Sequence, residues 1–207
     1  METIKFENGQ EPEILSRVEQ LGFKTFKGSA NYDLNIIGVR NPSPMPDQFD
    51  DLLFVCYKNH GVWFQHKFKC TTDPSLYYLR KPLNVKGTAI MVSPQQCRSV
   101  YQLDLHQGKY KALCQRNGSV KVWRDSNRNS ILDRSGEEFE GAGINIHRAS
   151  AYSVVDSIGR YSAGCTVIQD PEDFAEFISL CEKQVDLNGW KNFTYTLING
   201  QAGDFHA

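Results

Sequence analysis

Short segments of β-strand character, separated by turn residues, run through most of this sequence and restrict its fold more than any other feature. Segments 52–58 and 62–69 flank Asn59-His60-Gly61 and predict a β-hairpin with a three-residue loop. In the second arm every other residue, from Val62 to Phe68, belongs to one largely apolar face. Further strands are predicted at 35–39, 88–92, 100–105, 110–115, 120–124, 144–147, 166–168 and 192–198.

Helical patterns occur near both ends of the chain. Residues 12–21 place their apolar side chains on one face, with Pro12 near the first turn and Gly22 after the end. Asp170-Pro171 supplies an N-cap and a first-turn proline for a second helix, which Gly189 ends. We therefore expect a single β-rich α+β domain over residues 1–207, in which residues 1–30 form the N-terminal helix and lead-in.

Charge and hydropathy argue against several classes of partner. The 23 Lys and Arg residues nearly balance the 24 Asp and Glu residues, and a net charge of -1 gives no electrostatic reason to expect a nucleic acid or an anionic membrane. No apolar run approaches the roughly 18 residues that span a bilayer. The first residues show no basic segment followed by an apolar one, so we expect a protein made in the cytosol without a secretory signal.

The sequence contains 6 cysteines, and no two of them are spaced as Cys-x-x-Cys. A zinc ribbon or a thioredoxin-type redox motif is therefore unsupported. Most of the cysteines are expected to be reduced core residues, as Cys56 and Cys181 are in apolar segments. Cys165 differs, because it opens a strand directly after a glycine.

Residues 143–168 combine a strand that ends in His147 with a second strand that begins at Cys165. We expect the intervening loop to fold back and bring thiol and imidazole together. The thiolate is the nucleophilic form of cysteine, and a free thiol with a pKa of ~8.5 is mostly protonated at neutral pH, so an adjacent imidazole would accept its proton. The alternative is that His147 is an ordinary polar residue and Cys165 a core residue.

The surroundings of Cys165 supply candidate donors for an oxyanion. Gly164 permits a tight backbone path, which would point the main-chain N–H groups of Gly164 and Cys165 at a developing negative charge. The hydroxyl of Ser162 would add a third donor. His106 follows a predicted strand and precedes a glycine turn, from which it would reach the same cleft as a second polar group.

This combination resembles the catalytic domain of L,D-transpeptidases, in which a His precedes a [Ser/Thr]-His-Gly-Cys motif. Ser162, Gly164 and Cys165 fill three of the four motif positions. The resemblance implies a β-rich α+β fold of the β-sandwich or mixed-sheet kind with a helix near each end. It also implies Cys165 as nucleophile, His147 as base, the carbonyl of Arg148 as the acceptor that orients the imidazole, and an oxyanion hole in the backbone around Gly164.

The resemblance further implies a cysteine acyl-transfer enzyme that acts on peptidoglycan stem peptides through a thioester. Ala163 stands where the motif has its His, beside the backbone expected to face the substrate, and the family's Arg or Asn after the Cys is missing from 166–168. Two alternatives stay open: a cell-wall peptidase that only hydrolyses, and a non-catalytic β-rich binding or structural module such as a virion component. The missing leader suits a phage-encoded or otherwise delivered cell-wall protein, and nothing in the sequence indicates an oligomeric state.

A loop rich in Asp and Asn precedes this motif. Its oxygen-bearing side chains, and one main-chain carbonyl, follow the spacing of calcium loops at positions 1, 3, 5, 7 and 9: Asp125, Asn127, Asn129, the carbonyl of Ile131, and Asp133. Ser130 stands where an EF-hand has Gly, and Gly136 where it has Glu. A surface turn explains the pattern equally well. Any Ca²⁺ here would be structural, and the expected catalysis needs no cofactor.

Overall fold

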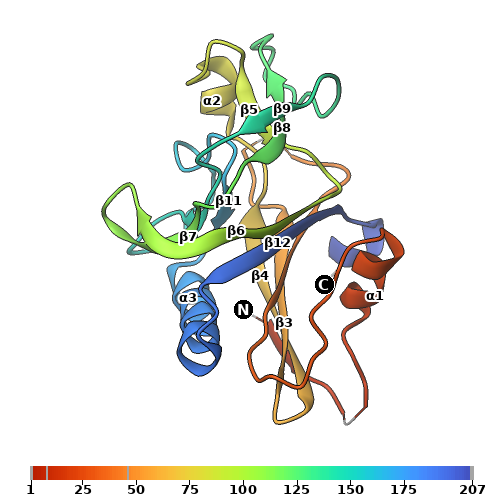
Figure 1. The fold of residues 1–207 in the computed structure, drawn as a ribbon. Coiled ribbons are helices and arrows are strands. Elements are labelled where there is room, and N and C mark those ends of the chain that lie inside the picture. Colours follow the sequence, from red (N-terminus) through yellow and green to blue (C-terminus); the bar gives the residue numbers. More distant parts are fainter. Residues whose placement is uncertain (1, 8, 46, 206–207) are drawn as a thin grey trace.

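Most strands of the protein close into a barrel. The computed structural model describes residues 2–7, 9–45 and 47–205. Nine strands pair in the order β1-β4-β11-β10-β7-β6-β12-β2-β3, and β3 also pairs with β4, which closes all of them except β1 into an eight-stranded ring (Figure 1). The strands of this sheet are β1 (Glu2–Lys5), β2 (Asn35–Arg40), β3 (Asp51–Asn59), β4 (Val62–Thr71), β6 (Gln95–His106), β7 (Tyr110–Gln115), β10 (Ile146–Arg148), β11 (Thr166–Ile168) and β12 (Asn192–Asn199).

A second, smaller sheet stands beyond one end of the barrel, at the top of Figure 1. It contains β5 (Thr88–Met91), β8 (Val120–Asp125) and β9 (Phe139–Gly141), all antiparallel. The short helix α2 (Leu76–Arg80) lies beside it. Between the two sheets runs the segment that contains Cys165.

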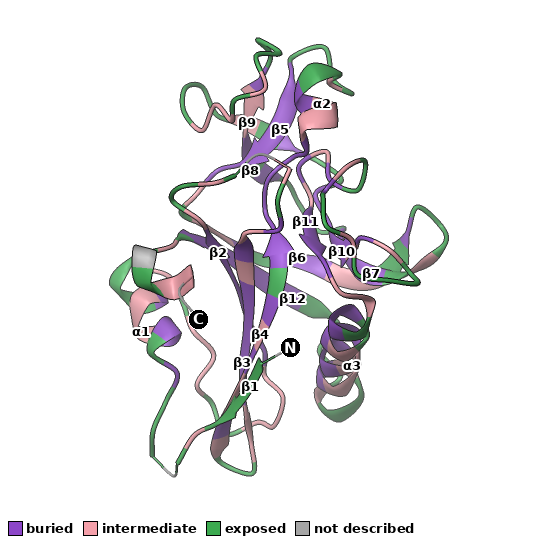
Figure 2. Ribbon diagram, turned by 180° about the vertical axis from the view of Figure 1, so that it is seen from behind, coloured by how far each residue is buried: buried purple, intermediate pink, exposed green. Residues whose placement is uncertain are grey.

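The two longer helices lie on opposite sides of the barrel (Figures 1 and 2). Helix α1 (Glu13–Gln20) packs Leu15 and Val18 against a cluster that includes Ile37 and Trp63, so it covers the outer face of β2, β3 and β4. Helix α3 (Pro171–Asn188) contributes Phe177 to the main core. Figure 2 shows the buried residues concentrated along the barrel strands.

The predicted helices and the β-rich α+β class are confirmed. The Asp170 side chain accepts a hydrogen bond from the main-chain N–H of Glu172 at the start of α3, and Gly189 ends the helix with a positive φ of 70°. The nine-stranded sheet is mixed, since β10 pairs with β11 and β12 with β2 in parallel while its other pairs are antiparallel. The eight strands of the ring belong to one closed sheet, whereas a β-sandwich has two separate sheets packed face to face.

The hairpin prediction is correct in place and wrong in loop length. Asn59 pairs with Val62, so the loop has only His60 and Gly61 between the strands. Both have positive φ, 49° and 79°, which is the geometry of the two-residue turn that matches the right-handed twist of a hairpin. Four elements were not predicted, namely β1, α2, β9 and the short 3-10 helix η1 (Ala202–Phe205).

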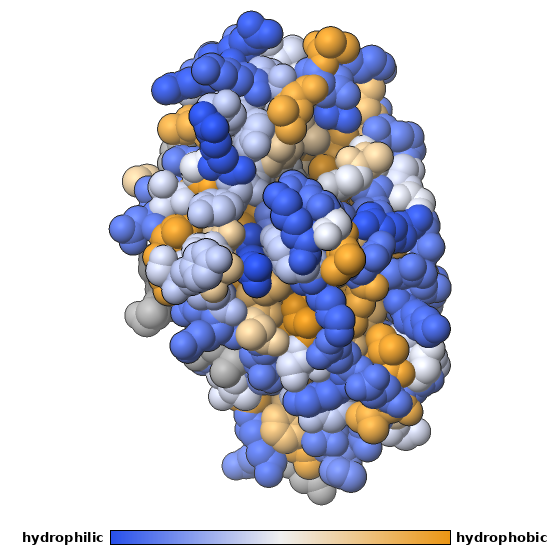
Figure 3. All heavy atoms as spheres, turned by 90° about the vertical axis from the view of Figure 1, so that its left-hand side faces the viewer, coloured by the Kyte–Doolittle hydropathy of each residue, from blue (hydrophilic) through white to orange (hydrophobic). Residues whose placement is uncertain are grey.

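The side of the molecule formed by α3 and the β6–β7 hairpin is shown in Figure 3. Its surface is mainly hydrophilic, and its hydrophobic residues are scattered among polar ones. A cavity of about 530 Å³ on this side is lined by Leu103, Leu105, Lys111, Glu182 and Val185 among others, and no Cys, Ser or His is among its described lining residues. The candidate chemistry therefore lies elsewhere.

Candidate active site around Cys165

The long loop after His147 leads back to a strand that lies directly beside the strand of His147. Strands β10 and β11 pair in parallel, with Ile146 opposite Thr166 and His147 opposite Val167. Asn145 lies beside Cys165: its main-chain N–H points at Cys165 Sγ over 3.4 Å, and its carbonyl accepts from Thr166 N at 3.0 Å. Because side chains alternate along a strand, Asn145 and His147 share the face of the sheet on which the cysteine lies.

The orientation of the His147 ring follows from one contact. Its Nδ1 lies 2.8 Å from the carbonyl oxygen of Arg148, and a carbonyl only accepts, so Nδ1 carries the proton and donates. This leaves the lone pair on Nε2, the nitrogen that would act as a base. The contact is the one that the resemblance implies. The hydroxyl of Tyr110 approaches the same Nδ1 at 3.5 Å.

His106 supports His147 rather than facing the cleft. The two imidazoles stack with ring centroids 4.2 Å apart and planes inclined by 25°. The side-chain amide of Asn145 lies 3.0 Å from His106 Nδ1. His106 is buried and is not among the described residues that line the cleft beside Cys165. His106 therefore lies behind His147 in the structure and not in the described lining of that cleft.

The Ser162 side chain makes hydrogen bonds within the turn before Cys165, and these bonds change the set of available oxyanion donors. The Ser162 hydroxyl is completely buried and donates to the carbonyl of Cys165 at 2.8 Å. It also accepts from the N–H of Gly164 at 3.2 Å. A hydroxyl has one proton, so neither Ser162 nor the Gly164 amide is placed to donate to an oxyanion, in contrast to the prediction. Of the predicted donors, only the Cys165 N–H has no recorded partner among the described residues.

Gly164 is required by close packing as well as by its backbone angle. Its φ is +123°, and a Cβ at this position would lie 2.5 Å from the carbonyl oxygen of Ala89 in β5. The small sheet therefore touches the turn directly. No other residue type fits this position without moving β5 away from the barrel.

Burial keeps the thiol and the imidazole uncharged. Desolvation raises the pKa of Cys165 to about 11, although the Asn145 N–H partly opposes this shift. Desolvation, followed by the nearby His106, lowers the pKa of His147 to about 3. At neutral pH both groups are neutral, so the expected ionised thiol is not the resting state. Among the described contacts, no hydrogen bond joins Sγ to the imidazole, a link that often forms only when substrate is bound.

Cys165 opens into a cleft of about 260 Å³ between the small sheet and the turn. Ala163 lines it, so the residue that replaces the motif's second His faces the same space as the sulfur. The opposite wall comes from the small sheet and the segment before it. Its members are Leu83, Asn84, Gly87, Thr88, Ala89 and Arg124, and residues 142–144 complete the lining.

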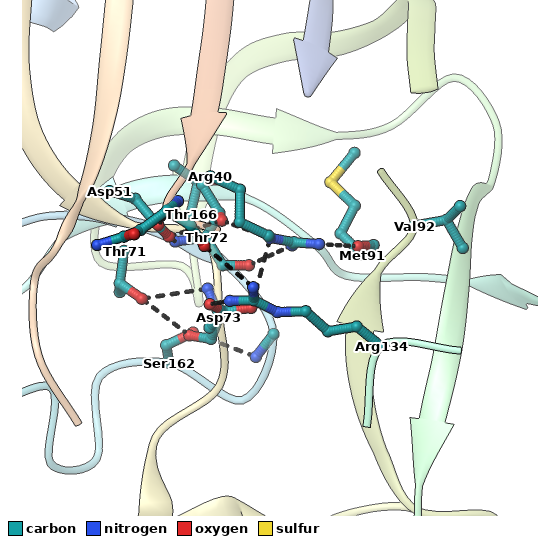
Figure 4. A network of polar contacts seen from close by, with 12 residues as sticks. Arg40, Asp51, Thr71, Thr72, Asp73, Met91, Val92, Arg134, Ser162 and Thr166 are labelled. Carbon is teal, nitrogen blue, oxygen red and sulfur yellow. Dashed lines mark hydrogen bonds and ion pairs between the residues drawn. The ribbon is translucent and has the colours of Figure 1, made fainter. Parts of the chain in front are cut away.

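A buried polar network lies behind the turn (Figure 4). Arg40, 1% exposed, donates through Nε and Nη2 to Oγ1 and O of Thr72 at 3.0 and 2.9 Å, and through Nη1 to Met91 O at 2.6 Å. Asp51 accepts from the N–H and hydroxyl of Thr72 at 2.6 and 2.7 Å. Burial raises the pKa of Asp51 to about 7. The network joins the end of β4 to β5.

The same network continues to the motif and to the Asp/Asn loop. Arg134 pairs with Asp73 and donates to the carbonyl of Asn41 at 3.1 Å. Ser75 N–H donates to Ser162 O at 2.9 Å. Sequence reasoning missed these positioning residues, because a buried Arg and two buried Asp residues leave no periodic signal.

The Asp/Asn loop folds back on itself. The Asn127 side chain lies 2.5 Å from an Asp133 carboxylate oxygen, and the Asp133 N–H donates to Asp125 at 3.2 Å. Asn129 accepts from the N–H of Ile131 at 2.8 Å, and Asn127 from that of Asn129 at 3.0 Å. Among the described residues, no three His, Cys, Asp or Glu side chains form a group that could hold a metal ion. A calcium ion would have to use amide and main-chain oxygens as well.

A larger cavity has neither Cys165 nor His147 in its described lining. It measures about 640 Å³ and is lined by Asn41, Phe49, Leu52, Lys67 and Phe205 among others. Its described lining includes no Cys, His or Ser. The smaller cleft is the stronger candidate, because Cys165 lines it and the oriented imidazole of His147 lies on the neighbouring strand, on the face that carries the cysteine.

No protein-family model matches this chain, and neither the curated proteins nor the solved structures give a significant match. Within the described residues, no helix is long and apolar enough to cross a membrane.

Proposed function

We propose that this protein is a cysteine acyl-transfer enzyme of the L,D-transpeptidase type, with peptidoglycan stem peptides as substrates. The observation that carries the proposal is the parallel pairing of β10 with β11. It puts Cys165 at the edge of a cleft and His147 on the same face of the neighbouring strand, with Nδ1 fixed by Arg148 O. A structural His and a core Cys would not need this combination.

The chemistry follows from the neutral pair. The substrate carbonyl carbon is attacked by Cys165 Sγ while Nε2 of His147 takes the thiol proton, so no charged pair has to exist before the substrate binds. The resulting imidazolium gives its proton to the leaving amine as the C–N bond breaks, and a thioester is left on Cys165. A second amine then attacks the thioester carbonyl and gives a proton to His147, and the C–S bond breaks as His147 returns that proton to the sulfur. The product is a new peptide bond, or the free acid when water attacks in place of the amine.

The Cys165 N–H is the main-chain group proposed to bind the oxyanion, since the Gly164 N–H is bonded to Ser162. Because only one donor is preorganised for the oxyanion, contacts elsewhere on the substrate must supply much of the binding free energy. The fold supports a family likeness only in its mixed, β-rich sheets and terminal helices. A substrate in the cell wall also requires that the chain be delivered there, as a phage-encoded protein would be.

Intact-protein mass spectrometry tests the proposal. Wild-type protein is incubated with a stem tetrapeptide, and we expect a covalent adduct of the donor peptide minus its leaving amino acid. Addition of an acceptor amine should give a cross-linked product, whereas a free acid alone would indicate a peptidase. Cys165→Ala should form no adduct.

Cys97→Ala is the matched control, because Cys97 is buried near the other end of β6 and does not line the cleft. It should form the adduct like the wild type. If wild-type protein forms neither adduct nor product and behaves like Cys165→Ala with folded-state melting intact, the enzyme proposal fails. A non-catalytic binding module would then be the better account.

We also propose a structural Ca²⁺ at the Asp/Asn loop. Asp125 is 1% exposed, and within the part of the chain that the structure describes its buried Oδ1 has no hydrogen-bond partner. A buried, unpartnered carboxylate oxygen is costly unless a donor or cation satisfies it. Asp133, Asn127 and Asn129 would supply further oxygens of the kind that Ca²⁺ prefers.

A further inference from the structure

One charged side chain faces the cleft of Cys165. Arg124 lies in β8, paired with Ala89 of β5, and both residues line the same cleft as the sulfur. Of the described lining residues, Arg124 alone carries a formal charge. A cation without a counter-charge in a small cleft attracts anions.

The guanidinium of Arg124 is incompletely bonded. Its Nη1 donates to the Gly87 carbonyl at 3.3 Å, while its Nε is buried and has no hydrogen-bond partner among the described residues. A guanidinium carries five N–H donors arranged as a planar fork, which fits a carboxylate through two parallel hydrogen bonds. A buried N–H group that makes no hydrogen bond in the free protein can gain one from a ligand.

The other arginines near the site are already engaged. Arg40 and Arg134 are bonded within the network of Asp51 and Asp73, and Arg148 lies over the Tyr110 ring at 4.0 Å. Arg124 is therefore the guanidinium that an incoming peptide would meet beside Cys165.

We propose that Arg124 binds a carboxylate of the peptide substrate and thereby selects donors that carry a free carboxylate close to the bond attacked by Cys165. The inference rests on the proposed function, since it names a feature of the substrate for that site. Two sources share this chemistry: the terminal carboxylate of the leaving amino acid and a side-chain carboxylate of the stem peptide.

Binding to the inactive Cys165→Ala protein tests the inference separately from catalysis. Isothermal titration calorimetry is performed with three forms of one stem tetrapeptide: unmodified, amidated at its C-terminus, and amidated at its side-chain carboxyl. We expect Arg124→Gln to weaken binding of the unmodified peptide by about tenfold or more. It should leave unchanged the affinity for the form in which the recognised carboxylate is already amidated, which identifies the source.

Arg124→Lys should bind with intermediate affinity, because lysine keeps the charge but not the fork. Arg98→Gln, which alters an exposed arginine of β6, should bind like its parent. The inference is overturned if Arg124→Gln weakens all three peptides equally, or none, while its melting temperature matches its parent. Arg124-dependent binding without any adduct in the wild type would retain this inference and reject the acyl-transfer proposal.

Discussion

The side chain of Tyr195 occupies the space that a side chain at Gly38 would need: a Cβ on Gly38 would overlap the Tyr195 hydroxyl. Tyr195 is fully buried in β12, and its hydroxyl shares a hydrogen bond of 3.0 Å with Thr166 Oγ1. Thr166 directly follows Cys165. The glycine in β2 thus lets a tyrosine cross the barrel interior and hold the strand that starts at the nucleophile.

Gly38→Ala should lower the free energy of unfolding by about 1–3 kcal/mol, because overpacking of a buried contact displaces its neighbours. Tyr195→Phe should cost about 1 kcal/mol through the lost hydrogen bond to Thr166. Urea denaturation measures both. The double variant should lose less free energy of unfolding than the sum of the two single losses, since the phenyl ring lacks the hydroxyl oxygen that overlaps the added methyl group. Strict additivity would show that Gly38 and Tyr195 do not compete for this space.

Ser162→Ala should destabilise the protein by about 1–3 kcal/mol, because the Gly164 N–H and the Cys165 carbonyl both lose the partner on which they depend. The turn would also hold Cys165 less firmly, so adduct formation should slow. Urea denaturation and the rate of adduct formation are the two measurements. Ser153→Ala alters an exposed serine of the same long loop and should change neither. A wild-type adduct rate in Ser162→Ala would mean that the hydroxyl does not position the nucleophile.

Local patterns predicted most of the strands because these are short, largely apolar segments bounded by turn residues; β2 and β5, for example, are buried along their whole length. Strand β1 was missed since all of its residues are exposed, which leaves no apolar periodicity to detect. Closure of the barrel depends on pairing β12 with β2, far apart in sequence, and no local pattern encodes such a pair.

The candidate site was only partly predictable for the same reason. The loop between His147 and Cys165 was expected to return, and it does so in parallel register. The partners of Ser162 and the stacking of His106 depend on how the turn and β6 meet β10, which is a tertiary result. In the sequence Arg124 has only the pattern of a strand residue. Its position beside Cys165 depends on how β8 lies against the turn, which is again a tertiary result.

Burial of His147 should make the protein less stable in mild acid. Its pKa is about 3 in the folded state and ~6.5 when unfolded, so between these values only the unfolded chain binds the proton. The free energy of unfolding should therefore fall as the pH drops from ~6.5 toward 3, by up to about 1.4 kcal/mol per pH unit. Asp51, with a pKa of about 7, contributes the opposite slope above pH ~4.

Comparison with His147→Gln isolates the contribution of this residue, since Asp51 and the other histidines are common to both proteins. Urea denaturation between pH 4 and 7 gives the two curves. The difference in free energy of unfolding between the wild type and the variant should narrow as the pH falls, because the variant has no imidazole at this position to protonate on unfolding. Parallel curves over this range would contradict a neutral, buried His147.

Alkylation of Cys165 should be slow at neutral pH and should accelerate steadily in alkali. With its pKa raised to about 11 by burial, the thiolate fraction grows about tenfold per pH unit up to that value. Iodoacetamide labelling followed by peptide mass spectrometry measures the rate between pH 6 and 10. Fast labelling with a plateau near pH 6 would instead indicate a preformed thiolate paired with His147. The other cysteines, all buried, should label more slowly still.

Calcium should stabilise the folded protein through the Asp/Asn loop. At a concentration ten times the dissociation constant, an ion that binds only the folded state adds about 1.4 kcal/mol, which corresponds to a rise of about 3–6 °C in melting temperature for a chain of this size. Asp125→Asn should abolish the rise, since it removes the charge from the buried, unpartnered carboxylate. Asp156→Asn, at an exposed position, should retain it. Mg²⁺ should give a smaller effect, because it demands tighter octahedral geometry and gives up its waters reluctantly. An unchanged melting temperature in millimolar Ca²⁺ would mean that the contact between Asn127 and Asp133 holds the loop without an ion.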